Sequence, residues 1–259
     1  MNSRRVFLGI SAIVFAASAA MTIVWCRSMS SMGEMAMPGG WTMSHMWMRS
    51  PTQSWLGATT SFVGMWVVMM VAMMLPSLTP ALSCYRESVR AVGPRCGWLT
   101  ALVGVGYFAV WAVLGLIVFP LGVAVAEIAM RQAELARVVP IVVGAVVLIA
   151  GVLQHSEWKA RQLALCREAT GAHLTLEVGA GAAWRHGLRL GLRCSQSCAG
   201  LTAVVLALGM MDLRVMAVAA AAITAERMAP NGVRVAHAIG MVGIASSVVM
   251  IVRATVYLT

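Results

Sequence analysis

The chain has 259 residues, of which 60% are hydrophobic and only 11% are charged, and its mean hydropathy is +0.85. Such a composition excludes an ordinary water-soluble domain and is typical of an integral membrane protein. The formal net charge of +10 does not indicate a nucleic-acid partner, because no basic patch is interleaved with aromatic residues. Metalloprotease, Walker, dinucleotide and Ser-His-Asp signatures are missing as well, so no catalytic or cofactor-binding residue and no enzymatic activity are predicted.

Seven apolar runs approach the roughly 20 residues that an α-helix needs to cross a bilayer. The runs are Val6–Trp25, Leu56–Leu75, Trp98–Phe119, Val138–Leu153, Leu190–Met211, Leu213–Ala225 and Val235–Val252. The sequence therefore predicts an all-α fold, a polytopic membrane helix bundle of about seven transmembrane helices. The count depends on a tight turn in which Gly209 ends one helix and Asp212 caps the next. Without that turn the count is six.

The first run lies within residues 1–25, follows Arg4 and Arg5, and is long for the apolar part of a cleaved secretory signal, so we predict a signal-anchor helix. Positive charge predicts the topology, because cytoplasmic segments carry an excess of Lys and Arg. With the N-terminus inside, seven spans place thirteen Lys and Arg residues in the cytoplasm and six outside. We therefore expect a multi-pass protein of the bacterial inner membrane, embedded in the lipid bilayer, with a cytoplasmic N-terminus and an external C-terminus.

Residues 26–55 form a methionine-rich outer loop in this topology. The loop holds seven methionines, three tryptophans and a Pro-Gly-Gly turn at 38–40, and we expect it to be flexible or only locally folded. Thioethers are soft ligands that bind Cu(I) without losing a proton. The candidate ligands in the loop are Met32, Met35, Met37, Met43, His45 and Met46. The alternative is a loop whose methionines rest on the membrane surface or beneath a partner protein.

The helical membrane domain, residues 56–259, opens with a helix whose thioethers all fall on one side at 100° per residue. These thioethers belong to Met65, Met69, Met73, Met70 and Met74, whereas Val67, Val68, Val71, Ala72 and Leu75 occupy the other side. Met65, Met69 and Met73 stack along one edge and are candidate ligands for a soft metal, although core packing accounts for the same pattern. Pro76 is expected to end this helix at the cytoplasmic side.

A cytoplasmic loop of about residues 154–193 follows the fourth span, and its segment 157–168 is predicted to form an amphipathic surface helix. Cys194 and Cys198 lie one helical turn apart just after the loop, so both thiols could bind one metal ion. Cys166 from the loop is the candidate third ligand. Cysteine is also a common small core residue, and an inert role in packing is the alternative.

Other residues of the membrane domain have structural interpretations. Glu226 is expected to form an ion pair or to act at a helix end. Close helix packing is predicted at Gly104, Gly106, Gly187 and Gly191. Solvated or structural roles are predicted for His155, His173 and His186.

Four segments carry a family resemblance. They are Met65-Trp66…Met69…Ala72-Met73-Met74-Leu75-Pro76, Gln154…Lys159…Cys166-Arg167, Gly187-x-x-x-Gly191-x-x-Cys194-x-x-x-Cys198 and Gly209-x-Met211-Asp212-Leu213…Met216-Ala217…Glu226-Arg227. In this order, over about residues 60 to 232, they resemble an uncharacterised bacterial family of predicted metal-binding integral membrane proteins. The resemblance implies a helical membrane fold that binds metal. The chain differs from the family at Gln162 and Ser197, where the family has cysteines, and at Asp212, where it has asparagine.

Together these patterns predict a membrane protein that binds a soft metal, with Cu(I) expected ahead of other soft transition metals. In the predicted route the outer methionines capture the ion, the thioether face passes it inward, and the cysteines receive it for uptake or hand-over. The alternative function is a non-transporting assembly or scaffold subunit of a membrane metalloenzyme complex. Such a subunit would have a membrane or periplasmic protein as its partner.

Overall fold

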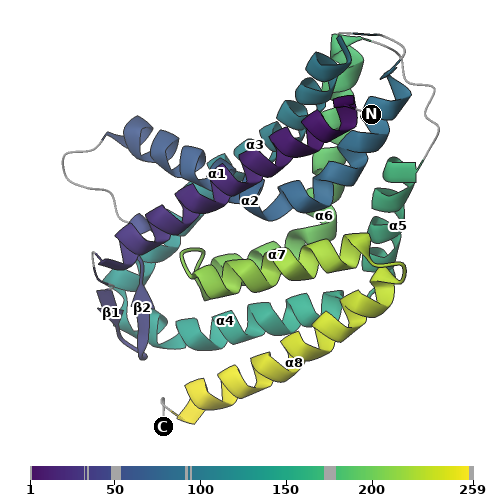
Figure 1. The fold of residues 1–259 in the computed structure, drawn as a ribbon. Helices are drawn as coiled ribbons and strands as arrows, with labels where there is room; N and C mark the ends of the chain where they lie inside the picture. The colour runs from purple at the N-terminus through teal and green to yellow at the C-terminus, as the bar shows by residue number, and fades with distance from the viewer. Residues whose placement is uncertain are drawn as a thin grey trace.

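The computed structural model describes residues 2–31, 33, 35–47, 54–90, 93, 95–171 and 179–256. Long helices run back and forth between two ends of a bundle, which we call the hairpin end, marked by strands β1 and β2, and the α5 end, marked by helix α5 (Figure 1). In chain order the elements are α1 (Asn2–Ser31), β1 (Met35–Met37), β2 (Trp41–Met43), the short 3-10 helix η1 (His45–Trp47), α2 (Trp55–Ser88), α3 (Arg95–Arg131), α4 (Ala133–Leu153), α5 (Glu157–Gly171), α6 (Ala180–Leu208), α7 (Leu213–Met228) and α8 (Gly232–Val256).

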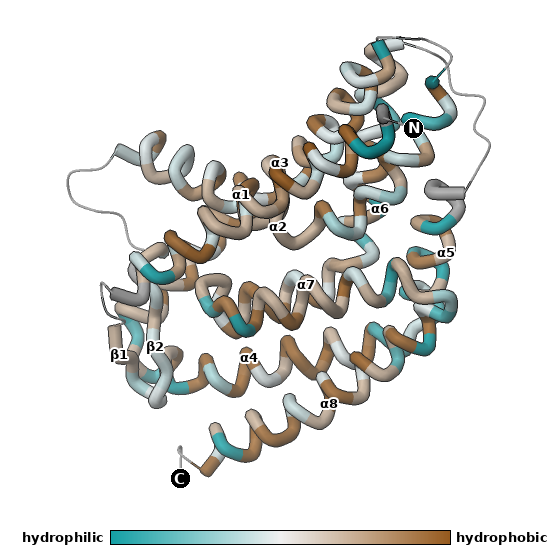
Figure 2. The backbone as a smooth tube through the Cα atoms, viewed as in Figure 1, coloured by the Kyte–Doolittle hydropathy of each residue, from teal (hydrophilic) through white to brown (hydrophobic). Residues whose placement is uncertain are grey.

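The predicted all-α fold is confirmed. Within the described residues, six helices are long and apolar enough to cross a membrane, namely α1, α2, α3, α4, α6 and α8, and Figure 2 shows apolar residues along their lengths. The predicted span Leu213–Ala225 corresponds to α7, which has 16 residues. At 1.5 Å per residue α7 is about 24 Å long, less than the roughly 30 Å of a bilayer core. The described residues therefore contain six helices of spanning length, which is the lower of the two predicted counts, and α7 as a shorter seventh helix.

The turn between α6 and α7 has the predicted form. Gly209 follows α6 with a φ of 117°, a conformation that favours glycine. The Asp212 carboxylate accepts hydrogen bonds from the backbone N–H groups of Arg214 (2.7 Å) and Val215 (3.4 Å), and so caps α7. As a result α7 runs back toward the α5 end (Figure 1).

Helix α2 does not end at Pro76, contrary to the sequence prediction. It continues through Pro76 and Pro80 and ends at Ser88. The Ser77 hydroxyl donates to the carbonyl of Met74 at 3.0 Å, and neighbouring helices pack around the segment. Proline removes one backbone hydrogen bond and bends a helix, but a packed membrane bundle tolerates this loss. Figure 1 shows α2 changing direction along its length.

The thioether face of α2 is turned into the bundle. Met69, Met70, Met73 and Met74 are at most 3% exposed, and Trp66 is 1% exposed. On the other side of the helix, the half-buried residues are Val67, Val68, Val71 and Ala72. The predicted sorting of thioethers from aliphatic side chains is therefore present in part, because Met65 is only half-buried and Leu75, on the aliphatic side, is 7% exposed. The four buried sulfurs face the protein interior.

Helices α3 and α6 approach closely because glycines lie between them. A Cβ on Gly187 would overlap the carbonyl oxygen of Val103, and a Cβ on Gly106 would lie 2.8 Å from the carbonyl oxygen of Trp184. Gly191 packs in the same way against the backbone of Tyr107. The predicted packing role is thus confirmed for these three glycines, whereas a Cβ on Gly104 would meet nothing within 4 Å. The close contact brings Tyr107 against the cysteines of α6.

Candidate metal site

Three sulfur atoms from two helices meet inside the bundle. Cys194 and Cys198 lie one turn apart on α6, and their Sγ atoms are 4.0 Å apart. The Sδ atom of Met74, on α2, lies 4.0 Å from the Cys194 Sγ. All three residues are at most 1% exposed. The spacing of the two cysteines on the helix places both thiols on its buried face.

The two sulfur–sulfur distances measured from Cys194 suit a single metal ion. If a metal–sulfur bond is about 2.3 Å, as in zinc thiolate sites, the ligands lie about 3.8 Å apart in tetrahedral and about 4.0 Å apart in trigonal geometry. Thiolates and thioethers are the soft ligands that select Cu(I). No three or more His, Cys, Asp or Glu side chains in the described part of the chain are arranged to hold a metal. A three-ligand site here therefore needs the Met74 thioether beside the two thiols.

Two hydrogen-bond donors converge on the sulfur of Cys194. The Tyr107 hydroxyl donates to Sγ at 2.8 Å, and the Arg227 guanidinium donates to it at 3.0 Å. Arg227 also donates to the Ser77 hydroxyl at 3.0 Å, which holds the guanidinium between α2 and α6. Cys198, in contrast, donates its own thiol to the backbone carbonyl of Cys194 at 2.9 Å. A positive charge and a hydroxyl donor on one sulfur stabilise a thiolate at Cys194.

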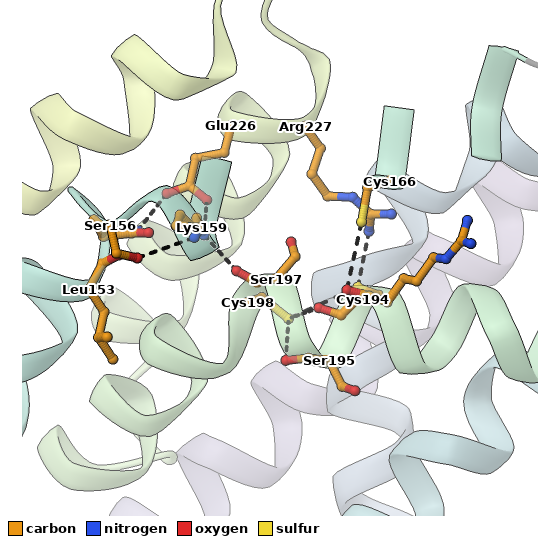
Figure 3. A network of polar contacts seen from close by, with 12 residues as sticks. Leu153, Ser156, Lys159, Cys166, Cys194, Ser195, Ser197, Cys198, Glu226 and Arg227 are labelled. Atoms are coloured by element: carbon orange, nitrogen blue, oxygen red, sulfur yellow. Dashed lines mark hydrogen bonds and ion pairs between the residues drawn. The ribbon is translucent and has the colours of Figure 1, made fainter. Parts of the chain in front are cut away.

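Cys166 of α5 lies beside this cluster (Figure 3). Its thiol donates to the backbone carbonyl of Arg193 at 3.7 Å. Burial raises the pKa of the Cys166 thiol, and the positive charge of Arg227 opposes the increase. A pocket of about 260 Å³ adjoins the cluster and is lined by Ser77, Pro80, Leu163, Cys166, Arg167, Arg227 and Met228. The pocket therefore reaches the guanidinium that contacts Cys194.

A buried ion pair lies next to the sulfur cluster (Figure 3). The Lys159 ammonium is 2.6 Å from the Glu226 carboxylate, and Gln154 donates to the same carboxylate at 2.6 Å. Lys159 also donates to the backbone carbonyl of Ser197 at 2.6 Å. Burial raises the pKa of Glu226, while Lys159 and then Gln154 oppose the increase. The ion-pair role predicted for Glu226 is confirmed, and the pair joins α7 to α5 and to the backbone beside Cys198.

Part of the methionine-rich segment folds as an antiparallel hairpin. Met35 lies opposite Met43 and Met37 lies opposite Trp41, so the three thioethers share one face of the two strands. The predicted turn at 38–40 is present, because the Gly40 N–H donates to the Met37 carbonyl at 3.3 Å. The turn needs glycine, since both of its glycines have positive φ.

The hairpin packs on the ends of α3 and α4. Met37 is 9% and Met43 is 3% exposed, and they form a small apolar cluster with Ala126, Ala129 and Ala136. The Trp41 indole N–H donates to the carbonyl of Ala136 at 2.8 Å. These two thioethers therefore pack against the bundle, whereas Met35 is 38% exposed.

The other predicted ligands are distributed along the bundle. Met65, Met69 and Met73 lie on the inward side of α2, but the thioether that reaches Cys194 is the next residue, Met74. Met46 packs partly buried against the same core. Met32 and the side chain of His45 lie outside the described residues. Metal binding by the predicted ligands of this group and of the hairpin stays a prediction.

Histidines that were expected to be structural make ring contacts. The rings of His155 and His237 stack with their centroids 4.9 Å apart, at the junction of α4 and α8. The ring of His186 stacks on Tyr85 at 5.3 Å. His173 lies outside the described residues.

Sequence reasoning placed Met74 on the thioether face of the helix but did not choose it as a ligand. It did not identify Tyr107, Arg227 and Ser77 as members of the site. Arg227 had a detectable signal, because it is a charged residue at the end of an apolar run, next to Glu226.

A second pair of neighbouring sulfur atoms, those of Cys26 and Met211, could not be detected from the sequence. The Cys26 thiol is 2% exposed and lies 3.9 Å from the Met211 sulfur, although the two residues are 185 positions apart. Cys26 is thus buried beside a thioether at the hairpin end.

These features define a class of protein: a helical protein whose described residues form six helices of membrane-spanning length and enclose a buried cluster of soft sulfur ligands. The PpoB2 family, described as a copper chaperone, matches residues 63–250, and the chain belongs to this family. The matched range contains the whole Met74–Cys194–Cys198 cluster together with Tyr107 and Arg227. The expected resemblance to a metal-related family is confirmed as membership of a copper-related one. No curated protein and no solved structure matched the chain.

Proposed function

We propose that this chain is a membrane copper chaperone, which binds copper as Cu(I) and hands it over across the bacterial inner membrane. The observation that carries the proposal is the buried cluster of Met74, Cys194 and Cys198, whose sulfur spacing suits one ion. Soft, desolvated sulfur ligands favour Cu(I) over harder cations. The family description supports copper as the metal.

A line of contacts leads from the hairpin end to the cluster. Trp47, just after the hairpin, contacts Phe62 with ring centroids 5.6 Å apart, and Phe62 stacks on Trp66 at 6.1 Å. The buried thioethers of α2 follow Trp66 and end at Met74, which reaches Cys194. We propose that the hairpin end faces outside and captures copper on its methionines. Met65, Met69 and Met73 then pass the ion toward thiolates, which bind it more strongly than thioethers.

The binding half of the proposal is tested on the full chain purified in detergent and loaded with Cu(I) under reducing conditions. Metal content by mass spectrometry should be stoichiometric for the wild type and should fall to the background of an unrelated membrane protein for the Cys194→Ser, Cys198→Ser double variant. Cys84→Ser is the matched control, because Cys84 is an exposed cysteine of α2 outside the cluster. Unchanged copper in the double variant would refute this site.

The hand-over half is tested in proteoliposomes with a Cu(I)-sensitive dye inside. The triple variant Met65→Leu, Met69→Leu, Met73→Leu preserves side-chain volume, so it should keep copper at the cysteines and lose transfer. Transfer at the wild-type rate would refute the route. Copper binding without transfer by the wild type would point instead to the non-transporting assembly role, in which a stoichiometric partner protein should co-purify.

A further inference from the structure

We propose that Arg227 makes the sulfur cluster selective for a monovalent over a divalent metal cation. The inference rests on the proposed function, because it takes Met74, Cys194 and Cys198 as the ligands. It gives Arg227 a role that does not require contact with the metal. The charge of its guanidinium determines the charge of the metal ion that the site prefers. The observation behind it is the 3.0 Å contact between the guanidinium and the Cys194 sulfur.

The site is buried, so its net charge matters. Cys194 and Cys198 are 0% and 1% exposed and Met74 is 0% exposed. A charge held without a partner in such surroundings is strongly unfavourable. Metal-binding thiols lose their protons, whereas a thioether ligand is neutral. The two thiolates and Met74 therefore carry two negative charges, of which the guanidinium balances one.

One negative charge remains for the metal to balance. A monovalent ion such as Cu(I) makes the assembly of ligands, metal and Arg227 neutral. A divalent ion such as Zn(II) leaves one uncompensated positive charge inside the bundle. Arginine suits this role because its guanidinium keeps its charge at any accessible pH.

The neighbouring charges do not change this balance. Lys159 and Glu226 are buried and neutralise each other at 2.6 Å. Arg167 is half-buried, and its guanidinium donates to the carbonyls of Ala229 and Pro230. Arg193 is half-buried and donates to the carbonyl of Leu165 at 3.5 Å. Arg227 is the cation in direct contact with a ligand sulfur.

Arg227 is also held where its charge is needed. Its second hydrogen bond goes to Ser77, the residue after Pro76 within α2, at 3.0 Å. The adjacent Glu226 is anchored by Lys159 and Gln154. The last turn of α7 is therefore fixed on both sides, and the guanidinium cannot move away without breaking these contacts.

The test compares affinities for Ag(I), a monovalent probe without redox chemistry, and Cd(II), a divalent thiophilic probe, by competition on the purified full chain. In Arg227→Gln the ratio of Ag(I) to Cd(II) affinity should fall by at least about tenfold, the lower end of what close charge pairs contribute. Arg227→Lys, which keeps the charge, should retain most of the ratio. Arg161→Gln is the control for a lost positive charge, since Arg161 is exposed and paired with Glu157, and its ratio should stay at the wild-type value.

A second measurement uses the wild type alone, in case Arg227→Gln does not fold. The wild-type ratio should exceed that of dithiothreitol, a dithiol without an arginine. A ratio no greater than that of dithiothreitol, or an unchanged ratio in folded Arg227→Gln, would overturn the role of Arg227. If the wild type bound neither Ag(I) nor Cu(I), the proposed function itself would fail, and the two failures are therefore distinguishable.

Discussion

Cys194 is the residue at which four helices meet. Within 4.0 Å of its sulfur lie Met74 from α2, Tyr107 from α3, Cys198 from α6 and Arg227 from α7. Two of these neighbours are soft ligands and two are hydrogen-bond donors. These neighbours therefore favour both the binding of a soft ion by the Cys194 sulfur and a negative charge on this buried sulfur.

At this scale we predict that Met74→Leu weakens Cu(I) binding by about tenfold. Leucine has a similar size but cannot bind the metal, so the site would keep only the two cysteine ligands. The measurement is competition with a chromophoric Cu(I) chelator in detergent. Met69→Leu is the matched control, since Met69 is equally buried on the same helix, and its equilibrium affinity should equal that of the wild type. Equal weakening by both substitutions would show that the effect is one of packing.

The pH dependence of stability should report on Glu226. Its pKa is raised in the folded protein, chiefly by burial, so its contribution to the free energy of unfolding is complete below the unfolded pKa of about 4.3. The contribution is lost as the pH rises through the folded pKa. Relative to Glu226→Gln, which cannot titrate, the wild-type melting temperature should therefore fall as the pH rises above about 4. A difference that grows with pH would mean that the attraction of Lys159 outweighs burial.

At the scale of single elements, α6 is positioned by its glycines and α2 by its prolines. Gly187 and Gly191 allow the backbone of α6 to lie against α3, which turns Cys194 and Cys198 toward Tyr107. Helix α2 continues through Pro76 without ending, and Ser77, one residue later, accepts a hydrogen bond from Arg227. Both helices therefore place polar or sulfur groups at the cluster through backbone features.

Gly187→Ala should lower the melting temperature in detergent strongly, because the new methyl group would overlap the carbonyl oxygen of Val103. Forcing the helices apart costs about 1–3 kcal/mol or more. Gly104→Ala on the facing helix is the control, since nothing lies within 4 Å of its Cβ position and alanine favours the helix. Comparable losses from the two substitutions would contradict the close α3–α6 contact.

Sequence periodicity predicted which residues come together in some of these elements but not in others. The i, i+4 spacing predicted the Cys194–Cys198 pair, and the glycine and aspartate of the α6–α7 turn predicted its geometry. The pattern could not decide between Met73 and Met74, because both lie on the same face and the rotation of α2 against α6 determines which sulfur reaches Cys194. Tyr107 and Arg227 come from helices far away in the chain, so only tertiary packing brings them to the site.

At the scale of the whole molecule, the helices alternate in direction between the two ends, and the chain ends lie at opposite ends of the bundle (Figure 1). Although α7 is shorter than a bilayer core, it too runs from the hairpin end toward α5. Six crossings alone would place both chain ends on one side of the membrane, so this arrangement requires that the shorter α7 also crosses. We therefore predict that reporters fused to the two chain ends lie on opposite sides of the membrane, with the N-terminus in the cytoplasm. Alkaline phosphatase and green fluorescent protein fusions, active outside and inside respectively, measure this. Both ends on one side would mean that α7 does not cross.

The tight burial of the thioether face has a consequence for what else crosses the bilayer. Trp66, Met69, Met73 and Met74 are each at most 3% exposed, so there is little room beside them for a file of water molecules. An ion that travels past these side chains must shed its hydration shell and bind sulfur directly, which protons, sodium and potassium do poorly. In the route that we propose, copper would therefore pass along the sulfurs without opening a parallel path for protons, sodium or potassium.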